Sequence, residues 1–327
     1  MTLTPEKKKE LFWFMLLSRR LDECAWRLHH EGKITYHISA IGHEATQAAA
    51  AFALQKGQDW VAPYYRDLTL LLALGLAPRD FLLGWMGKQG DPASGGRQLP
   101  GSWGLRSANV ISVTSLAAGH IPHAVGVAHA MKLRGSAQVV LAACGEGATS
   151  LGDWYEAANW AAVHKLPVVF LVENNHYAIS TRQEKQMAVK NVSEKAAGLG
   201  MPGVTVNGND WQTVYQAVRQ AVEAARRGDG PALVEAEVNR IPPHSSDDDD
   251  RTYRTRQEVE GYEALDPLAH TRLVLENEGV LTTAMLREME AKAKTLVEDA
   301  VRDAEEAPYP PAVDSPFPVF AEDSRHA

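Results

Sequence analysis

Two short polar segments combine residue types that together could hold a metal ion and a diphosphate group. Residues 145–147 read Gly-Glu-Gly, and residues 174–175 read Asn-Asn. Glycine has no Cβ, so a diphosphate can approach the backbone closely. Glu146 and Asn175 supply hard oxygen ligands of the kind that Mg²⁺ prefers beside phosphate oxygens, and Tyr177 offers a backbone carbonyl. The sequence therefore predicts a magnesium–diphosphate site with these three residues as metal ligands.

A predicted buried strand precedes each polar segment. Residues 139–143 and 166–172 are continuous apolar runs, which are typical of strands that are buried on both faces of a sheet. Residues 150–153 resemble a capping box and predict a helix between the two strands. In parallel α/β sheets, ligands bind beyond the carboxyl ends of the strands, where turn amides and helix N-termini point at anions. Both polar segments are therefore expected at the same edge of one sheet.

The strand–helix pattern continues after the second polar segment. Residues 203–206 predict a strand, residues 211–222 a helix that Asp210 caps, and residues 232–236 another strand. Strand–helix–strand units of this length imply a parallel sheet with right-handed crossovers. The predicted fold class is α/β, with a mostly parallel sheet flanked by helices.

Helices are also predicted at both ends of the chain. Residues 5–31 and 44–54 form two of them, and residues 282–306 form a charged C-terminal helix before a Pro-rich tail. We expect residues 1–260 to be a diphosphate- and magnesium-binding domain. Residues 261–327 are expected to be a helical C-terminal extension.

Amino-acid composition argues against nucleic-acid-binding, disulfide-bonded and membrane-spanning proteins. The 327 residues are 45% hydrophobic and 23% charged, and the formal net charge of −8 argues against sequence-independent nucleic-acid binding. Cys24 and Cys144 are far apart in apolar settings, which favours buried thiols in a reducing compartment over a disulfide. The chain starts without a signal-peptide pattern and has no apolar run of about 18 residues. We expect a cytoplasmic protein with no membrane or nucleic-acid partner.

The order of the polar segments resembles a known cofactor motif. Gly-Glu-Gly, then residues 148–173, then Asn-Asn is similar to the thiamine-diphosphate motif, whereas no Gly-x-Gly-x-x-Gly of a dinucleotide-binding fold follows a strand. Residues 64–67, 95–100 and 239–245 resemble the alpha chain of branched-chain 2-oxo acid dehydrogenases. The resemblance runs from about residue 10 to the C-terminal helices. Pyruvate dehydrogenase alpha chains differ at residues 34–45 and 96–100, so the branched-chain family is favoured.

The resemblance implies roles for particular residues. It implies that Arg66 and Arg240 bind diphosphate, because a guanidinium fork pairs two phosphate oxygens at once. It implies that His244 is catalytic near neutral pH, either steadying a carbonyl intermediate or assisting acyl transfer. The cofactor-binding residues that it implies are Tyr65, Arg66, Ser115, Ala117, Gly145, Glu146, Gly147, Ala148 and Arg240. Without the resemblance, Arg66 could pair with Asp67, Arg240 with the aspartates at 247–250, and His244 could be a solvated loop residue.

Two features of the family stay open in this sequence. Ser245 lies where some relatives are phosphorylated, but an unmodified serine is the better interpretation of one sequence. The potassium site of some alpha chains is in doubt, because Leu116, Gly119 and His120 replace the residues expected to supply its oxygens. No chemistry is predicted for Asp247–Asp250.

The resemblance also implies an activity and partners. The activity is that of the alpha subunit of 3-methyl-2-oxobutanoate (2-oxoisovalerate) dehydrogenase, which decarboxylates 2-oxo acids oxidatively in branched-chain amino acid catabolism and transfers the acyl unit to a lipoyl group. In the family that this chain resembles, the glutamate that acts on the cofactor's aminopyrimidine ring is supplied by the beta chain. The resemblance therefore implies an assembly of two alpha and two beta chains, docked on a lipoyl acyltransferase core. The alternatives are a pyruvate or acetoin dehydrogenase alpha subunit, and a non-catalytic interaction subunit that keeps the fold.

Overall fold

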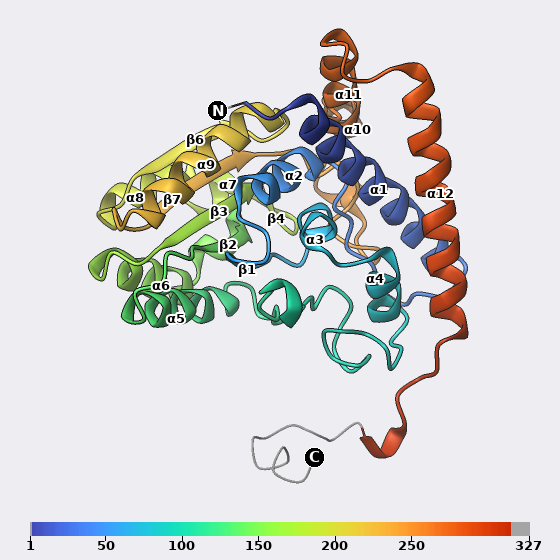
Figure 1. Ribbon diagram of the computed structural model, residues 1–327, viewed down its shortest axis with the longest axis horizontal. Helices are drawn as coiled ribbons and strands as arrows, with labels where there is room; N and C mark the ends of the chain where they lie inside the picture. The colour runs from blue at the N-terminus through green and yellow to red at the C-terminus, as the bar shows by residue number, and fades with distance from the viewer. Residues whose placement is uncertain (1, 315–327) are drawn as a thin grey trace.

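A five-stranded parallel sheet forms the centre of the computed structural model, which describes residues 2–314 (Figure 1). In spatial order the strands are β1 (Trp60–Ala62), β2 (Val140–Gly145), β3 (Val168–Asn174), β7 (Ala232–Glu237) and β6 (Gly203–Asn207). The register pairs Gly145 with Glu173, so β2 and β3 end side by side. The two polar segments therefore follow neighbouring strand ends, and the predicted α/β fold is confirmed.

Both faces of the sheet are covered by helices, which explains why the central strands are apolar throughout. Figure 1 shows α5 (His120–Leu133) and α6 (Gly152–Val163) on one face, and α2 (Glu44–Ala53) and α9 (Trp211–Arg226) on the other. Side chains of β2 alternate between the two buried clusters: Val140 and Ala142 belong to one, Leu141 and Ala143 to the other. This is the period of two expected for a strand.

The terminal helices pack together at one edge of the molecule. Helix α1 (Pro5–His30) begins at Thr4, whose hydroxyl accepts a hydrogen bond from the amide of Lys7 at 3.3 Å. Helix α12 (Thr283–Glu306) runs along α1 and also packs against α4 (Pro78–Trp85) (Figure 1). The predicted helices at both ends of the chain are thus confirmed.

The C-terminal part of the chain adds two further helices, α10 (Arg256–Glu263) and α11 (Pro267–Asn277). The division into domains at residue 260 stays a prediction. The Pro-rich tail beyond residue 314 lies outside the described residues. Among the residues that are described, no helix has the length and apolarity needed to cross a bilayer.

The predicted capping box at residues 150–153 is wrong. Strand β2 leads into a short 3₁₀ helix, η2 (Glu146–Ser150), and α6 begins at Gly152 with Leu151 in the capping position. The Leu151 side chain has no acceptor, and the Ser150 hydroxyl instead accepts a hydrogen bond from Gln186 Nε2 at 2.9 Å. Ser150 is therefore used for tertiary contact and leaves the first turn of α6 uncapped by a side chain.

Candidate active site

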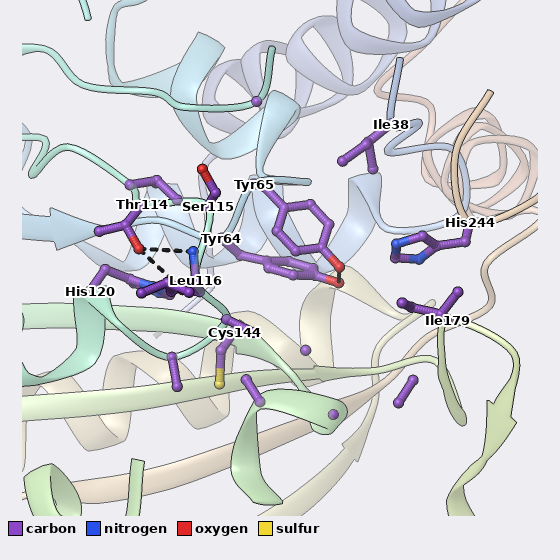
Figure 2. A pocket seen from close by; sticks show the side chains of 18 of the residues that line it. Ile38, Tyr64, Tyr65, Thr114, Ser115, Leu116, His120, Cys144, Ile179 and His244 are labelled. Carbon is purple, nitrogen blue, oxygen red and sulfur yellow. Dashed lines mark hydrogen bonds between the residues drawn. The ribbon is translucent and has the colours of Figure 1, made fainter. Parts of the chain in front are cut away.

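A cavity of about 440 Å³ lies where β2 and β3 end (Figure 2). Its walls come from segments that are far apart in the sequence: the residues after β1, the loop before α5, the start of η2, the turn after β3, and the loop that carries His244. The predicted site residues that line it are Tyr65, Ser115, Ala117, Gly145, Glu146, Gly147, Ala148, Tyr177 and His244. The cavity is thus at the strand ends, as expected for ligand sites in parallel sheets.

The other three predicted site residues, Arg66, Asn175 and Arg240, are buried and contact residues that line the cavity. The Nη2 atom of Arg66 lies 3.5 Å from His244 Nδ1, and Nη1 of Arg240 lies 3.4 Å from the same atom. The backbone amide of Asn175 donates to Glu146 Oε2 at 3.3 Å. The structure therefore gathers all the residues that the sequence singled out.

Gly145 and Gly147 are required for space. An added Cβ at Gly145 would lie 2.8 Å from the hydroxyl oxygen of Tyr64, and one at Gly147 would lie 2.9 Å from Cβ of Ala178. Neither glycine has a positive φ angle. The missing Cβ atoms thus let two walls of the cavity approach the segment that carries Glu146.

The Glu146 carboxylate is buried and only partly satisfied. Burial raises its pKa, and its Oε1 atom has no hydrogen-bond partner among the described residues. Within residues 2–314, the neighbouring Asn175 Oδ1 accepts only a 3.3 Å bond, from the amide of Tyr177. A buried carboxylate oxygen without a partner costs about 1–3 kcal/mol or more. The oxygens at this position fit a hard cation that would complete them.

Within residues 2–314, no three His, Cys, Asp or Glu side chains gather as an all-protein metal cage would require. Mg²⁺ is usually held by one or two carboxylates together with substrate phosphates and water. The Glu146 carboxylate and the side-chain oxygen of Asn175 are a donor set that fits a metal which shares its coordination with a phosphate ligand.

Two buried guanidinium groups lie close to the cavity without a hydrogen-bonded carboxylate. Arg66 donates to the carbonyl oxygen of Ser39, and Arg240 donates to the carbonyl of Ile179 at 2.8 Å and to the hydroxyl of Tyr253 at 2.9 Å. Both Nε atoms lack a partner among the described residues. Asp67 accepts its hydrogen bond from the amide of Tyr64, so the simple pairing with Arg66 is not formed. Uncompensated buried charge of this kind favours binding of a multiply charged anion.

His244 lies between these two arginines. Burial, followed by the charges of Arg66 and Arg240, lowers its pKa from 6.5 to about 3. The imidazole is therefore neutral at neutral pH. Because a guanidinium can only donate, Nδ1 is the acceptor and the ring proton is on Nε2.

The aspartate run at 247–250, for which no chemistry was predicted, holds the His244 loop in shape. Asp248 accepts a hydrogen bond from the amide of His244 at 2.8 Å and another from the Tyr253 hydroxyl. Arg254 donates to the carbonyl of Pro242 at 2.9 Å and to the Asp250 carboxylate. The run of four aspartates and the three arginines that follow it were visible in the sequence, but the sequence did not show which of these side chains turn inward.

Ser245 is 6% exposed. Its hydroxyl would have to leave this position before a modifying enzyme could reach it. Whether it is modified stays open.

A cluster of buried polar residues behind the cavity was missed by the sequence analysis. Burial lowers the pKa of His43 far below its usual value, so the neutral ring donates from Nδ1 to Glu173 Oε2 at 2.6 Å. Gln47 donates to the same oxygen at 3.1 Å. Burial and the neighbouring Glu173 raise the pKa of Asp67 well above its usual range. The four residues come from the start of α2 and the residue before it, the segment after β1, and β3, and only the fold brings them together.

The loop before α5 is fixed by two sets of hydrogen bonds, of which Figure 2 shows the first. The Thr114 hydroxyl closes a turn with the backbone of Leu116, at 3.1 Å to the nitrogen and 3.2 Å to the oxygen. His120 is buried, which lowers its pKa, and its Nε2 donates to the carbonyl of Ala143 at 2.7 Å. His120, one of the residues that put a potassium site in doubt, thus connects the loop to β2 through its side chain.

Comparison with known proteins gives the family. Residues 13–313 match the family described as Dehydrogenase E1 component. The chain is 46% identical over 307 residues to the 2-oxoisovalerate dehydrogenase subunit alpha of Bacillus subtilis (strain 168), covering 94% of this chain and 93% of that protein. It is 36% identical over 305 residues to the 3-methyl-2-oxobutanoate dehydrogenase subunit alpha of Mycobacterium tuberculosis (92% and 80% covered). It is 36% identical over 304 residues to the pyruvate dehydrogenase E1 component subunit alpha of Staphylococcus aureus (strain Mu50 / ATCC 700699; 93% and 79% covered). The chain therefore belongs to the dehydrogenase E1 component family.

Proposed function

We propose that the chain is the alpha subunit of a thiamine-diphosphate-dependent branched-chain 2-oxo acid dehydrogenase that acts with a beta subunit. One observation carries the proposal: a buried carboxylate, Glu146, with one oxygen lacking a hydrogen-bond partner among the described residues, lies at the same end of the parallel sheet as two buried guanidinium groups. This arrangement suits a metal-bound diphosphate. The higher identity to a 2-oxoisovalerate dehydrogenase alpha subunit, 46% against 36% for the pyruvate relative, favours the branched-chain substrate class.

Each predicted residue has a place in this site. Glu146, Asn175 and the backbone carbonyl of Tyr177 would hold magnesium. Tyr65, Arg66 and Arg240 would hold the diphosphate, with Gly145, Gly147 and Ala148 leaving room beside it, and Ser115 and Ala117 would contact the middle of the cofactor. When bound, thiamine diphosphate supplies the electron sink that lets a 2-oxo acid lose carbon dioxide.

His244 is best suited to donating a hydrogen bond. Its Nδ1 atom faces two guanidinium groups, so the proton on Nε2 is the one available to a substrate oxygen. With a pKa of about 3, the ring is a poor general base in the chain as described. Pairing of Arg66 and Arg240 with an anion would weaken their effect and raise the pKa of His244 toward its ordinary value.

The apolar part of the cavity suits an aliphatic acyl group. Ile38, Leu116 and Ile179 line it together with Val113 (Figure 2). The substrate preference can be tested with the chain assembled with its beta subunit. The measurement compares kcat/KM for 3-methyl-2-oxobutanoate, pyruvate and acetoin. We expect 3-methyl-2-oxobutanoate to be preferred. Preference for pyruvate or acetoin would assign the chain to one of those dehydrogenases.

The cavity mouth supports a shared active site. Leu99, Leu116 and Ile179 line the cavity and are 63%, 73% and 56% exposed, and apolar side chains at a site are commonly covered by a partner. We propose an assembly of two alpha and two beta chains, acting with a lipoyl acyltransferase core. We place it in the cytoplasm, because Cys24 and Cys144 are free, buried thiols.

One outcome would refute the shared active site, and another would refute the catalytic role of the chain. Robust turnover by the purified alpha chain alone would refute the shared site. A chain that binds the beta subunit but no thiamine diphosphate would be a non-catalytic interaction subunit, against which the assembled Glu146, Asn175, Arg240 and His244 already argue.

A further inference from the structure

A single carboxylate on α10 collects three hydrogen bonds next to the proposed metal site. Glu258 Oε1 accepts from the Tyr177 hydroxyl at 2.6 Å and from the Tyr262 hydroxyl at 3.1 Å. Glu258 Oε2 accepts from Arg182 Nη2 at 2.9 Å. Both oxygens of the Glu258 carboxylate are therefore engaged, by two hydroxyl groups and one guanidinium group.

These contacts hold both strands of one hairpin. Tyr177 belongs to β4 (Tyr177–Ala178) and Arg182 to β5 (Thr181–Arg182), which pair antiparallel directly after the Asn-Asn segment. Glu258 lies outside the parallel sheet and is hydrogen-bonded to one side chain of each strand of the hairpin.

The hairpin needs such support because its backbone is strained. His176 has φ 66° and Ile179 has φ 57°, so two residues with side chains adopt the left-handed region that favours glycine. Such residues are strained and persist only where surrounding contacts fix them. Contacts within the site supply some of these: Asn174 Oδ1 accepts from the amide of His176 at 2.9 Å, and Arg240 donates to the carbonyl of Ile179.

We propose that Glu258 is a positioning residue that fixes the turn of residues 175–182 from α10 and thereby sets the affinity of the site for magnesium. The inference rests on the proposed function, because Asn175 and Tyr177 are the metal ligands proposed there. Helix α10 starts at Thr255, where the His244 loop ends. Glu258 therefore also links the order of that loop to the order of the metal-binding turn.

The first test is binding of Mg²⁺ at saturating thiamine diphosphate, measured by calorimetry on the assembled alpha–beta complex. Glu258→Ala and Tyr177→Phe should each weaken the apparent affinity for Mg²⁺ by about tenfold, the effect of one charge-assisted hydrogen bond. The double variant should bind Mg²⁺ no more weakly than Glu258→Ala alone, because Glu258→Ala already removes the contact with Tyr177 together with those to Arg182 and Tyr262. Glu260→Ala is the matched control, since Glu260 lies on the same helix and pairs with Arg256 on the surface. It should bind like the unmodified complex.

The second test is hydrogen exchange of the peptide covering residues 175–182, without cofactor. Exchange should be faster in Glu258→Ala and Tyr177→Phe than in Glu260→Ala, and Glu258→Gln, which keeps an acceptor, should lie between them. Unchanged Mg²⁺ affinity, effects that add in the double variant, or unchanged exchange would overturn the inference. If Glu258→Ala does not fold, Tyr177→Phe and Glu258→Gln decide it. Absence of cofactor binding by the unmodified complex would instead refute the proposed function, and the exchange measurement would still decide whether Glu258 fixes the turn.

Discussion

Adding one methyl group at Gly147 should damage the site without changing any charged or polar side chain. The new Cβ would lie 2.9 Å from Cβ and 3.4 Å from Cα of Ala178. Ordinary carbon–carbon contacts lie at about 3.5–4.0 Å, so one of the two segments must move by roughly 1 Å. Ala178 has no flexible side chain to yield, and it lies in the strained hairpin beside Tyr177. The movement therefore separates the metal-binding turn from the segment that carries Glu146.

The magnitude follows from the cost of overpacking. Inserting a methyl group into a tightly packed site costs about 1–3 kcal/mol, which corresponds to about 5- to 150-fold in affinity. We expect Gly147→Ala to weaken Mg²⁺-dependent binding of thiamine diphosphate by a factor in this range. Gly152→Ala is the control, because a Cβ added there meets nothing within 4 Å.

Calorimetric titration of the assembled complex measures both variants. A second substitution, Ala178→Gly, removes the clashing methyl group, so Gly147→Ala combined with Ala178→Gly should bind more tightly than Gly147→Ala alone. The reasoning is wrong if Gly147→Ala binds as tightly as Gly152→Ala. It is also wrong if Ala178→Gly changes the binding affinity by the same factor in the Gly147→Ala variant as it does in the otherwise unmodified chain.

Three further predictions concern stability, each measured by urea denaturation. Because burial and two neighbouring arginines hold the pKa of His244 at about 3 instead of 6.5, the unfolded chain takes up a proton between these values that the folded chain does not. Protonation of His244 should therefore cost no stability above pH 6.5 and should lower stability as the pH drops through that window, by up to about 1.4 kcal/mol per pH unit, so the fall should be smaller in His244→Gln; equal falls contradict this. His120→Leu leaves the carbonyl of Ala143 unpaired and should cost about 1–3 kcal/mol, with a smaller loss in His120→Gln, which keeps a donor; equal losses would mean that the hydrogen bond is unimportant. Trp154→Ala empties a fully buried position and should cost about 3–5 kcal/mol, so a loss below about 1 kcal/mol would refute its place in the core.

The strands could be predicted because their burial is uniform. Residues 139–143 and 166–172 face helices on both sides, so a short continuous apolar run is the only pattern that fits them. Helix α5 was missed for the opposite reason. Its solvent side carries Pro122, Gly126 and Ala130, and its charged residue, Lys132, lies only at the C-terminal end, so the sequence shows little amphipathic contrast.

The site could be predicted where its residues lie at strand ends. Glu146 and Asn175 follow two adjacent parallel strands, and this local order is sufficient to bring them together. The support around them could not be predicted, because it depends on long-range packing. Glu258 contacts Tyr177 from a distant part of the sequence, and His43, just before α2, contacts Glu173. Neither pairing has a periodicity or a spacing that would reveal it.

The central claim is that Glu146 helps to hold thiamine diphosphate and magnesium in a site shared with a beta subunit. Its most direct test is calorimetric titration of thiamine diphosphate with Mg²⁺ into the chain co-expressed with that subunit, compared with the same complex carrying Glu146→Ala. We predict saturable binding by the unmodified complex and no detectable binding by the variant. No binding by a well-folded unmodified complex, or undiminished binding by Glu146→Ala, would contradict the account.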